Sequence, residues 1–172
     1  MNDDIIKHNI INYEKVIKIM LIGNKNSGKS LFCKKILNNK EEIKETQFLE
    51  IKKKVVEINN EKILLELWDS NEQFINSALI NIYYKLANAF IIIVDTNSDF
   101  NFIIKQINLI KSIQKNAQIL FICNNKYNNN DLFNIEQYKE FIYKDKNFFN
   151  LMNLHEISID NNVIQNFLLK LI

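Results

Sequence analysis

The octapeptide Gly23-Asn24-Lys25-Asn26-Ser27-Gly28-Lys29-Ser30 decides the fold of this chain. It contains both of the chain's glycines and matches the pattern G-x-x-x-x-G-K-[ST]. In such a loop the backbone N–H groups surround a nucleotide's phosphates, the lysine reaches the outer phosphates and the last hydroxyl binds Mg²⁺. The sequence therefore predicts a phosphate-binding loop. We expect every residue of the octapeptide, and Leu31 after it, to contact a nucleotide.

The residues on either side have the context that this loop requires. Residues 16–22 form a short apolar run typical of a buried strand, and residues 30–37 have apolar side chains spaced for a helix with one buried face. A helix that begins at the loop also directs the positive end of its dipole toward the phosphates. We expect Lys29 to neutralise charge on the β- and γ-phosphates and Ser30 to bind Mg²⁺.

Strand and helix patterns alternate along the rest of the chain. Further strands are predicted over 51–58, 63–67, 89–94, 119–123 and 154–157, and further helices over 74–85, 102–113, 135–143 and 163–172. The run Asn59-Asn60-Glu61 joins the first two of these strands into a hairpin, because asparagine tolerates the backbone that glycine usually supplies there. The order predicts an α/β protein with the P-loop NTPase fold. We expect one domain over 1–172, with a mainly parallel, doubly wound six-stranded sheet, one antiparallel edge hairpin and about five flanking helices.

Composition limits the classes of partner. The 172 residues are 47% hydrophobic and 24% charged, with a net charge of +2, which indicates a soluble globular domain and argues against a nucleic-acid partner. All 22 basic residues are lysine, so this chain offers no bidentate guanidinium clamp for phosphate. Two isolated cysteines predict neither a disulfide nor a zinc site. The chain shows no signal peptide or lipidation motif. We therefore expect a cytoplasmic monomer without its own lipid anchor, which reaches membranes only through partners.

The order of the motifs resembles that of the Ras-superfamily small GTPases, and within them the Rab branch. The run Leu65-Glu66-Leu67-Trp68-Asp69-Ser70-Asn71-Glu72-Gln73 is similar to the Rab segment L-Q-I-W-D-T-A-G-Q. Without gaps, Tyr83-Tyr84-Lys85 then falls where Rabs have Y-Y-R, and Asp95 where they have Y-D. The resemblance implies that the chain binds GTP or GDP with Mg²⁺ and acts on effector and regulatory proteins.

The resemblance also implies roles around the phosphates. Thr46 falls at the threonine that senses the γ-phosphate through Mg²⁺, with an ordinary loop threonine as the alternative. Asp69 corresponds to the Asp of D-x-x-G, which is expected to hold Mg²⁺ through water, so Ser30, Thr46 and Asp69 form the expected metal set. Gln73 matches the glutamine that orients the attacking water, which makes Gln73 and Lys29 the catalytic candidates.

Two positions depart from the family pattern near the γ-phosphate. Glu72 replaces the glycine of D-x-x-G, where two like charges at about 4 Å and an effective dielectric near 20 repel by roughly 4 kcal/mol. Lys25 stands where the family has a small residue. It either lies across the γ-phosphate, obstructs a partner's arginine finger, or is an ordinary solvated lysine.

The base-reading motifs are also altered. Asn125-Lys126-Tyr127-Asn128 resembles N-K-x-D, but Asn128 offers one acceptor and one donor where guanine needs two acceptors. Each unpaired buried group costs about 1–3 kcal/mol, so xanthine suits Asn128 better. Asp131 is the alternative acceptor. Ser158-Ile159-Asp160 corresponds to S-A-K, in which Ile159 still supplies the backbone N–H.

Three functions are compatible with the sequence. The first is a Rab-like GTP/GDP switch in vesicle trafficking or signalling, a GTP hydrolase with slow or impaired turnover. It would contact effectors through the switch loops and through Trp68, Tyr83 and Tyr84, for which core packing is the alternative. The second is a pseudo-GTPase scaffold that holds diphosphate or no nucleotide. The third is a nucleotide kinase, against which the lack of arginine counts.

Overall fold

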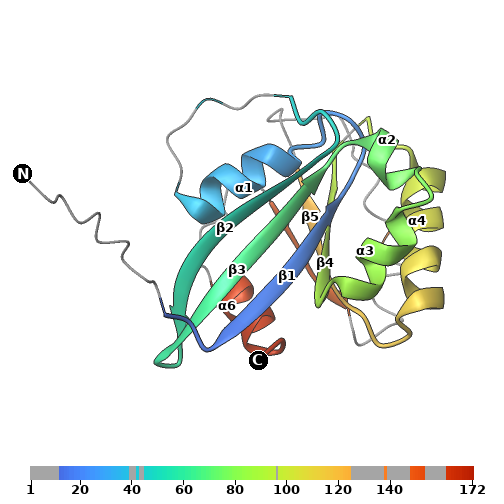
Figure 1. The fold of residues 1–172 in the computed structure, drawn as a ribbon. Coiled ribbons are helices and arrows are strands. Elements are labelled where there is room, and N and C mark those ends of the chain that lie inside the picture. The colour runs from blue at the N-terminus through green and yellow to red at the C-terminus, as the bar shows by residue number, and fades with distance from the viewer. Residues whose placement is uncertain are drawn as a thin grey trace, which may run out of the picture.

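The computed structural model describes residues 12–38, 42, 45–95, 97–124, 138, 148–153 and 162–172. Within them the strands form one sheet in the order β2-β3-β1-β4-β5-β6 (Figure 1). The strands are β1 (Lys15–Ile22), β2 (Leu49–Ile58), β3 (Glu61–Ser70), β4 (Ala89–Val94), β5 (Gln118–Cys123) and β6 (Phe148–Asn153). The helices are α1 (Lys29–Leu37), α2 (Glu72–Ile75), α3 (Ile80–Leu86), α4 (Phe100–Ile113) and α6 (Asn162–Leu169).

The strand directions confirm the predicted fold class. β2 pairs with β3 antiparallel, and every other neighbouring pair is parallel. The hairpin turn between β2 and β3 has positive φ at both Asn59 (52°) and Asn60 (66°), as a two-residue hairpin turn requires. Asparagine takes the role of glycine here, as predicted.

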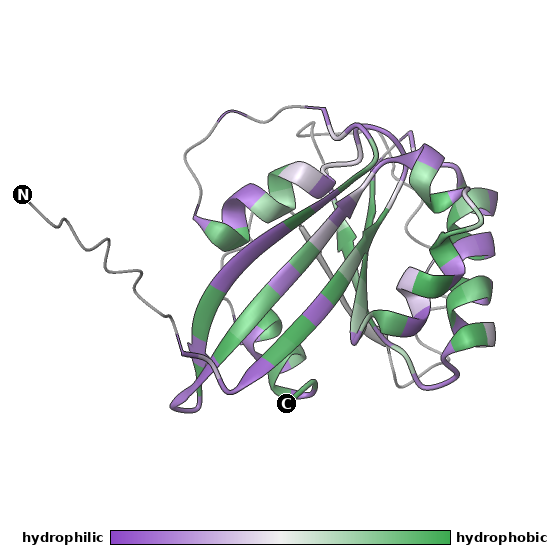
Figure 2. Ribbon diagram, in the orientation of Figure 1, coloured by the Kyte–Doolittle hydropathy of each residue, from purple (hydrophilic) through white to green (hydrophobic). Residues whose placement is uncertain are grey.

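Each face of the sheet has its own hydrophobic core. Successive strand residues point to opposite faces, so Ile19 and Leu21 of β1 join one core while Met20 and Ile22 join the other. Helices α1 and α6 cover the first face, and α2, α3 and α4 cover the second (Figure 1). Figure 2 shows that β1 and β3 are mostly hydrophobic, whereas the edge strand β2 carries a hydrophilic stretch. This arrangement fixes the strands whose carboxyl ends hold the candidate site.

Two predicted elements differ from the observed ones. The helix predicted over 74–85 is divided into α2 and α3, and at the break the N–H and the Oγ of Ser77 donate to the carbonyl of Phe74 at 3.0 and 2.7 Å. The last strand is at Phe148–Asn153, upstream of the predicted range. Its two aromatic residues favour a strand, although no strand was expected over this range.

Several further regions bear on the predictions. The predicted range 154–157 lies outside the described residues, and so does 135–143 apart from Tyr138, which is helical. Within the described part of the chain, no helix is both long and apolar enough to cross a membrane.

Candidate functional site

The phosphate loop connects β1 to α1, and its backbone explains both glycines. A Cβ atom on Gly23 would lie 2.2 Å from the carbonyl oxygen of Ile93 in β4, so no side chain fits there. Gly28 precedes α1 with φ 109°, a conformation that favours glycine. Asn26 has φ 64°, which asparagine tolerates. The loop therefore has the conformation that its pattern requires, with asparagine at a position of positive φ.

Lys29 closes the loop from inside. Its Nζ donates to the carbonyl oxygens of Gly23 and Asn24, both at 2.8 Å, and the residue is 7% exposed. Burial lowers the pKa of Lys29, and the carboxylates of Asp69, Glu72 and Asp95 only partly offset that effect. An ammonium group has three N–H donors, so one is left to meet an anion in the pocket.

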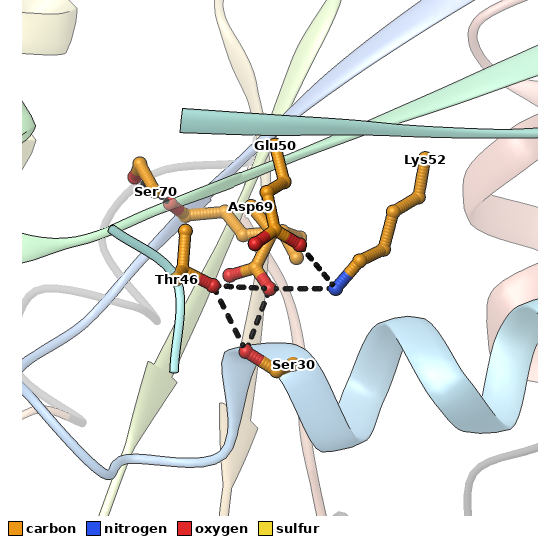
Figure 3. Close-up of polar contacts among 7 residues, drawn as sticks. Ser30, Thr46, Glu50, Lys52, Asp69 and Ser70 are labelled. Carbon is orange, nitrogen blue, oxygen red and sulfur yellow. Dashed lines mark hydrogen bonds and ion pairs between the residues drawn. The ribbon is translucent and has the colours of Figure 1, made fainter. Parts of the chain in front are cut away.

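The three predicted metal ligands lie together (Figure 3). Ser30 Oγ donates to Asp69 Oδ2 at 2.6 Å, Thr46 Oγ1 donates to the same oxygen at 3.2 Å, and the two hydroxyls are 3.4 Å apart. Asp69 Oδ1 is buried and has no hydrogen-bond partner in the described structure. Hydroxyl and carboxylate oxygens are hard ligands that suit Mg²⁺. A buried carboxylate oxygen without a partner is costly, and a bound cation would remove that cost. The residues present therefore fit a magnesium ion.

Lys52 also contacts Asp69, although no sequence motif predicts it. Its Nζ lies 3.1 Å from Asp69 Oδ2 and 3.3 Å from Glu50 Oε2. Burial is the largest single effect on the pKa of Lys52 and lowers it, but the charge of Asp69 and the hydrogen bonds to Asp69 and Glu50 act together to raise the pKa above its ordinary value, so the ammonium stays charged at neutral pH. The register of β2 against β3 pairs Glu50 with Asp69. Counting back through the hairpin turn would have revealed this neighbourhood.

A pocket of about 1230 Å³ lies beside Lys29, Ser30, Thr46 and Asp69. Its lining combines the phosphate loop, Thr46, the segment from Asp69 to Gln73, and Asn124. Glu72 and Gln73 lie in the first turn of α2, where Asn71 accepts a hydrogen bond from the N–H of Phe74. Glu72 thus lines the same pocket as Lys29 and adds a negative charge to it.

Lys25 forms an ion pair with Glu45, with Nζ and Oε1 2.7 Å apart. The pair connects the phosphate loop to the residue before Thr46. Both side chains are largely exposed, and exposed pairs of this kind contribute little to stability. Among the three alternatives for Lys25, the structure favours the solvated lysine, with Glu45 of the neighbouring loop as its ion-pair partner.

Asn124 supports the phosphate loop from β5. Its Nδ2 donates to the carbonyl oxygen of Ser27 at 2.8 Å, and its side chain is fully buried. The base-reading motif begins one residue later, at Asn125. Asn125, Lys126, Asn128 and Asp131 lie outside the described residues, as do Ser158, Ile159 and Asp160.

The aromatic residues expected to meet effectors are mostly part of the core. Trp68 and Tyr84 are buried, and Tyr84 donates to Gln106 Oε1 at 2.9 Å. Tyr83 is partly buried and packs edge-on against Trp68, with ring centroids 5.4 Å apart. The expectation that Trp68 and Tyr84 present a surface is therefore corrected in favour of core packing.

Comparisons with known proteins agree with this geometry. A family model described as "Ras of Complex, Roc, domain of DAPkinase" matches residues 18–128. Ras-related protein RabY of Dictyostelium discoideum is 31% identical over 96 residues, which cover 52% of this chain and 40% of RabY. Ras-related protein SEC4 of Saccharomyces cerevisiae is 30% identical over 92 residues, which cover 52% of this chain and 43% of SEC4. The matched part is less than half the length of either relative.

Proposed function

Since this chain belongs to the Ras superfamily of small GTPases, with Rab-related proteins among its relatives, we propose that it is a guanine-nucleotide-binding switch with slow hydrolysis. The proposed switch acts in vesicle trafficking or signalling. The observation that carries the proposal is the meeting of Lys29, Ser30, Thr46 and Asp69 at one pocket beside the phosphate loop.

Each of these residues has a separate task. Lys29 and the loop N–H groups hold the phosphates, with the lysine ammonium as counter-charge. Ser30, Thr46 and Asp69 would hold Mg²⁺, which supplies further neutralisation of the phosphate charge. Because all the basic residues are lysine, an arginine for transition-state stabilisation has to come from a partner protein.

Slow hydrolysis follows from the residues of α2. Glu72 adds a carboxylate to the pocket that receives the phosphates, and like charges in this setting repel. Gln73, the residue for positioning water, comes directly after Glu72 and is exposed. Repulsion that holds α2 away from the γ-phosphate also holds Gln73 away from it.

Calorimetric titration of the protein with GTP, GDP and XTP in the presence of Mg²⁺ tests the proposal. We expect binding of all three, with GDP tighter than GTP because of Glu72, and with XTP at least as tight as GTP because of Asn128. ATP serves as the control for base recognition. Absence of binding heat with all of the nucleotides at high micromolar concentration would rule out a nucleotide-dependent switch.

A scaffold that holds diphosphate without turnover is the second candidate. One observation favours it: Asp69 Oδ2 already accepts hydrogen bonds from Ser30, Thr46 and Lys52, so this oxygen has protein partners without a metal ion. A single-turnover assay with bound GTP separates the two candidates. Slow but measurable release of phosphate supports the switch, and retained GTP over many hours supports the scaffold.

A further inference from the structure

Lys52 brings a fixed positive charge to the oxygen atom at which the expected metal ligands meet. Asp69 Oδ2 accepts hydrogen bonds from Ser30 Oγ, Thr46 Oγ1 and Lys52 Nζ (Figure 3). The Asp69 side chain is 0% exposed, whereas that of Lys52 is 29% exposed. The ammonium thus reaches a buried carboxylate from the edge strand β2 while part of its side chain remains in contact with solvent.

The carboxylate of Glu50 is a second acceptor for the Lys52 ammonium. Glu50 Oε2 lies 3.3 Å from Lys52 Nζ, and the Glu50 side chain is 44% exposed. The two residues are two positions apart on β2, so their side chains leave the same face of the strand. Lys52 therefore lies between a buried and an exposed acceptor, and it can release the first while keeping the second.

We propose that Lys52 is a tethered cation that competes with Mg²⁺ for Asp69 and so reduces the dependence of nucleotide binding on Mg²⁺. The inference rests on the proposed function. Asp69 carries a single negative charge, which the Lys52 ammonium already neutralises at Oδ2, so a Mg²⁺ ion at either oxygen of this carboxylate is attracted less while the ammonium is in place. Because like charges repel, the ammonium is the donor that leaves, and it turns to Glu50.

This competition has two consequences for the affinity of the nucleotide. In the absence of Mg²⁺, Lys52 still neutralises Asp69, so the phosphates do not meet a bare carboxylate. In the presence of Mg²⁺, the ion replaces a charge that was already there, so its net benefit is small. The factor by which Mg²⁺ tightens nucleotide binding equals the factor by which nucleotide tightens Mg²⁺ binding, and Lys52 lowers both.

The test measures the dissociation constant of fluorescently labelled GDP in excess Mg²⁺ and again in EDTA. The ratio of the constant in EDTA to the constant in Mg²⁺ is the factor by which Mg²⁺ tightens binding. We expect Lys52→Met to raise this ratio about tenfold or more over the unmodified protein, since a full charge is removed next to the site. Lys52→Arg retains the charge and should leave the ratio close to the original. Glu50→Gln removes the charge of the exposed acceptor. Lys52 then stays on Asp69, and the ratio should fall.

Lys54→Met is the matched control. Lys54 is two residues further along β2, is also partly buried, and donates to the carbonyl oxygen of Ile36 at 3.3 Å instead of to Asp69. It tests for the loss of any lysine from this face of the strand, and we expect the ratio to be unchanged. An equal ratio in Lys52→Met and the unmodified protein would overturn the inference while leaving the proposed function intact.

A second measurement does not depend on nucleotide. Thermal unfolding is followed with Mg²⁺ as the only added ligand, and the Lys52→Met variant should gain more in Tm from Mg²⁺ than the unmodified protein gains. Equal gains would contradict competition for Asp69. Failure of the unmodified protein to bind GDP in either buffer would overturn the proposed function, and this second measurement would then decide the competition by itself.

Discussion

The phosphate loop and helix α2 line the same pocket, but they are supported by different neighbours. The loop is braced by the sheet: Asn124 after β5 bonds the carbonyl of Ser27, and the carbonyl of Ile93 in β4 packs against Gly23. Helix α2 leans on another loop. The N–H of Asn71 donates to the carbonyl of Phe48 at 2.9 Å, and the rings of Phe48 and Phe74 meet edge-on at 4.8 Å.

The two regions also differ in chemistry. The phosphate loop retains every residue that its pattern requires, whereas α2 begins with Glu72 in place of the glycine that the resemblance implies. Holding a phosphate and responding to a third phosphate are therefore separable properties of this chain. The loop is built to hold phosphate, and α2 is poorly suited to close on a triphosphate.

The largest expected effect is the loss of nucleotide from Lys29→Ala. The variant removes a buried ammonium that bonds two loop carbonyls and faces the pocket, and loss of one partner from a buried charged contact costs about 3–5 kcal/mol. We expect GDP affinity to fall about 100-fold or more, measured by calorimetry. Lys34→Ala, on the same helix but in its last turn, is the control and should bind as the unmodified protein does. Unchanged GDP retention in Lys29→Ala would mean that the phosphates bind elsewhere.

A smaller effect is expected from Asn124→Ala, which tests the support of the loop. The variant leaves the buried carbonyl of Ser27 without its partner at 2.8 Å. We expect the free energy of unfolding to fall by about 2 kcal/mol, measured by denaturant titration. Asn125→Ala is the comparison, because the base-reading motif begins at that position. A larger loss from Asn125→Ala than from Asn124→Ala would mean that the contact with Ser27 is not the main support of the loop.

Most of the fold could be predicted because its signals are local. The apolar runs of β1, β4 and β5, the turn at Asn59 and Asn60, and the loop pattern all occur within short stretches of sequence. The break between α2 and α3 could not be read in this way, because it occurs where Ser77 donates to the carbonyl of Phe74 through both its N–H and its Oγ. Apolar periodicity carries no information about such a bond.

The site was predicted where a motif fixes the residue and missed where tertiary pairing does. Ser30, Thr46 and Asp69 come from segments far apart in the sequence, yet the resemblance named all three. Lys52 has no motif, and its place beside Asp69 depends on the register of β2 against β3. Asn124 lies just before the base-reading motif and belongs to no motif, and its contact with Ser27 depends on how the end of β5 packs against the phosphate loop.

The smallest of these effects, and the one that bears most directly on the two regions, concerns Glu72. Glu72→Gln removes the charge from α2 while keeping the size of the side chain, and Glu72→Gly also restores the residue that the resemblance implies. Because Glu72 is only partly buried, solvent screens much of the repulsion. We expect the ratio of GTP to GDP affinity to rise about tenfold at most in either variant.

The two Glu72 variants separate charge from backbone. If repulsion is the cause, Glu72→Gln and Glu72→Gly should shift the ratio by similar amounts, and added salt should shrink the difference from the unmodified protein. If only Glu72→Gly shifts it, close approach of the backbone is the missing property. Identical ratios in all three proteins would remove the distinction between a loop that holds phosphate and a helix that resists the third one, since α2 would then have no part in the choice of nucleotide.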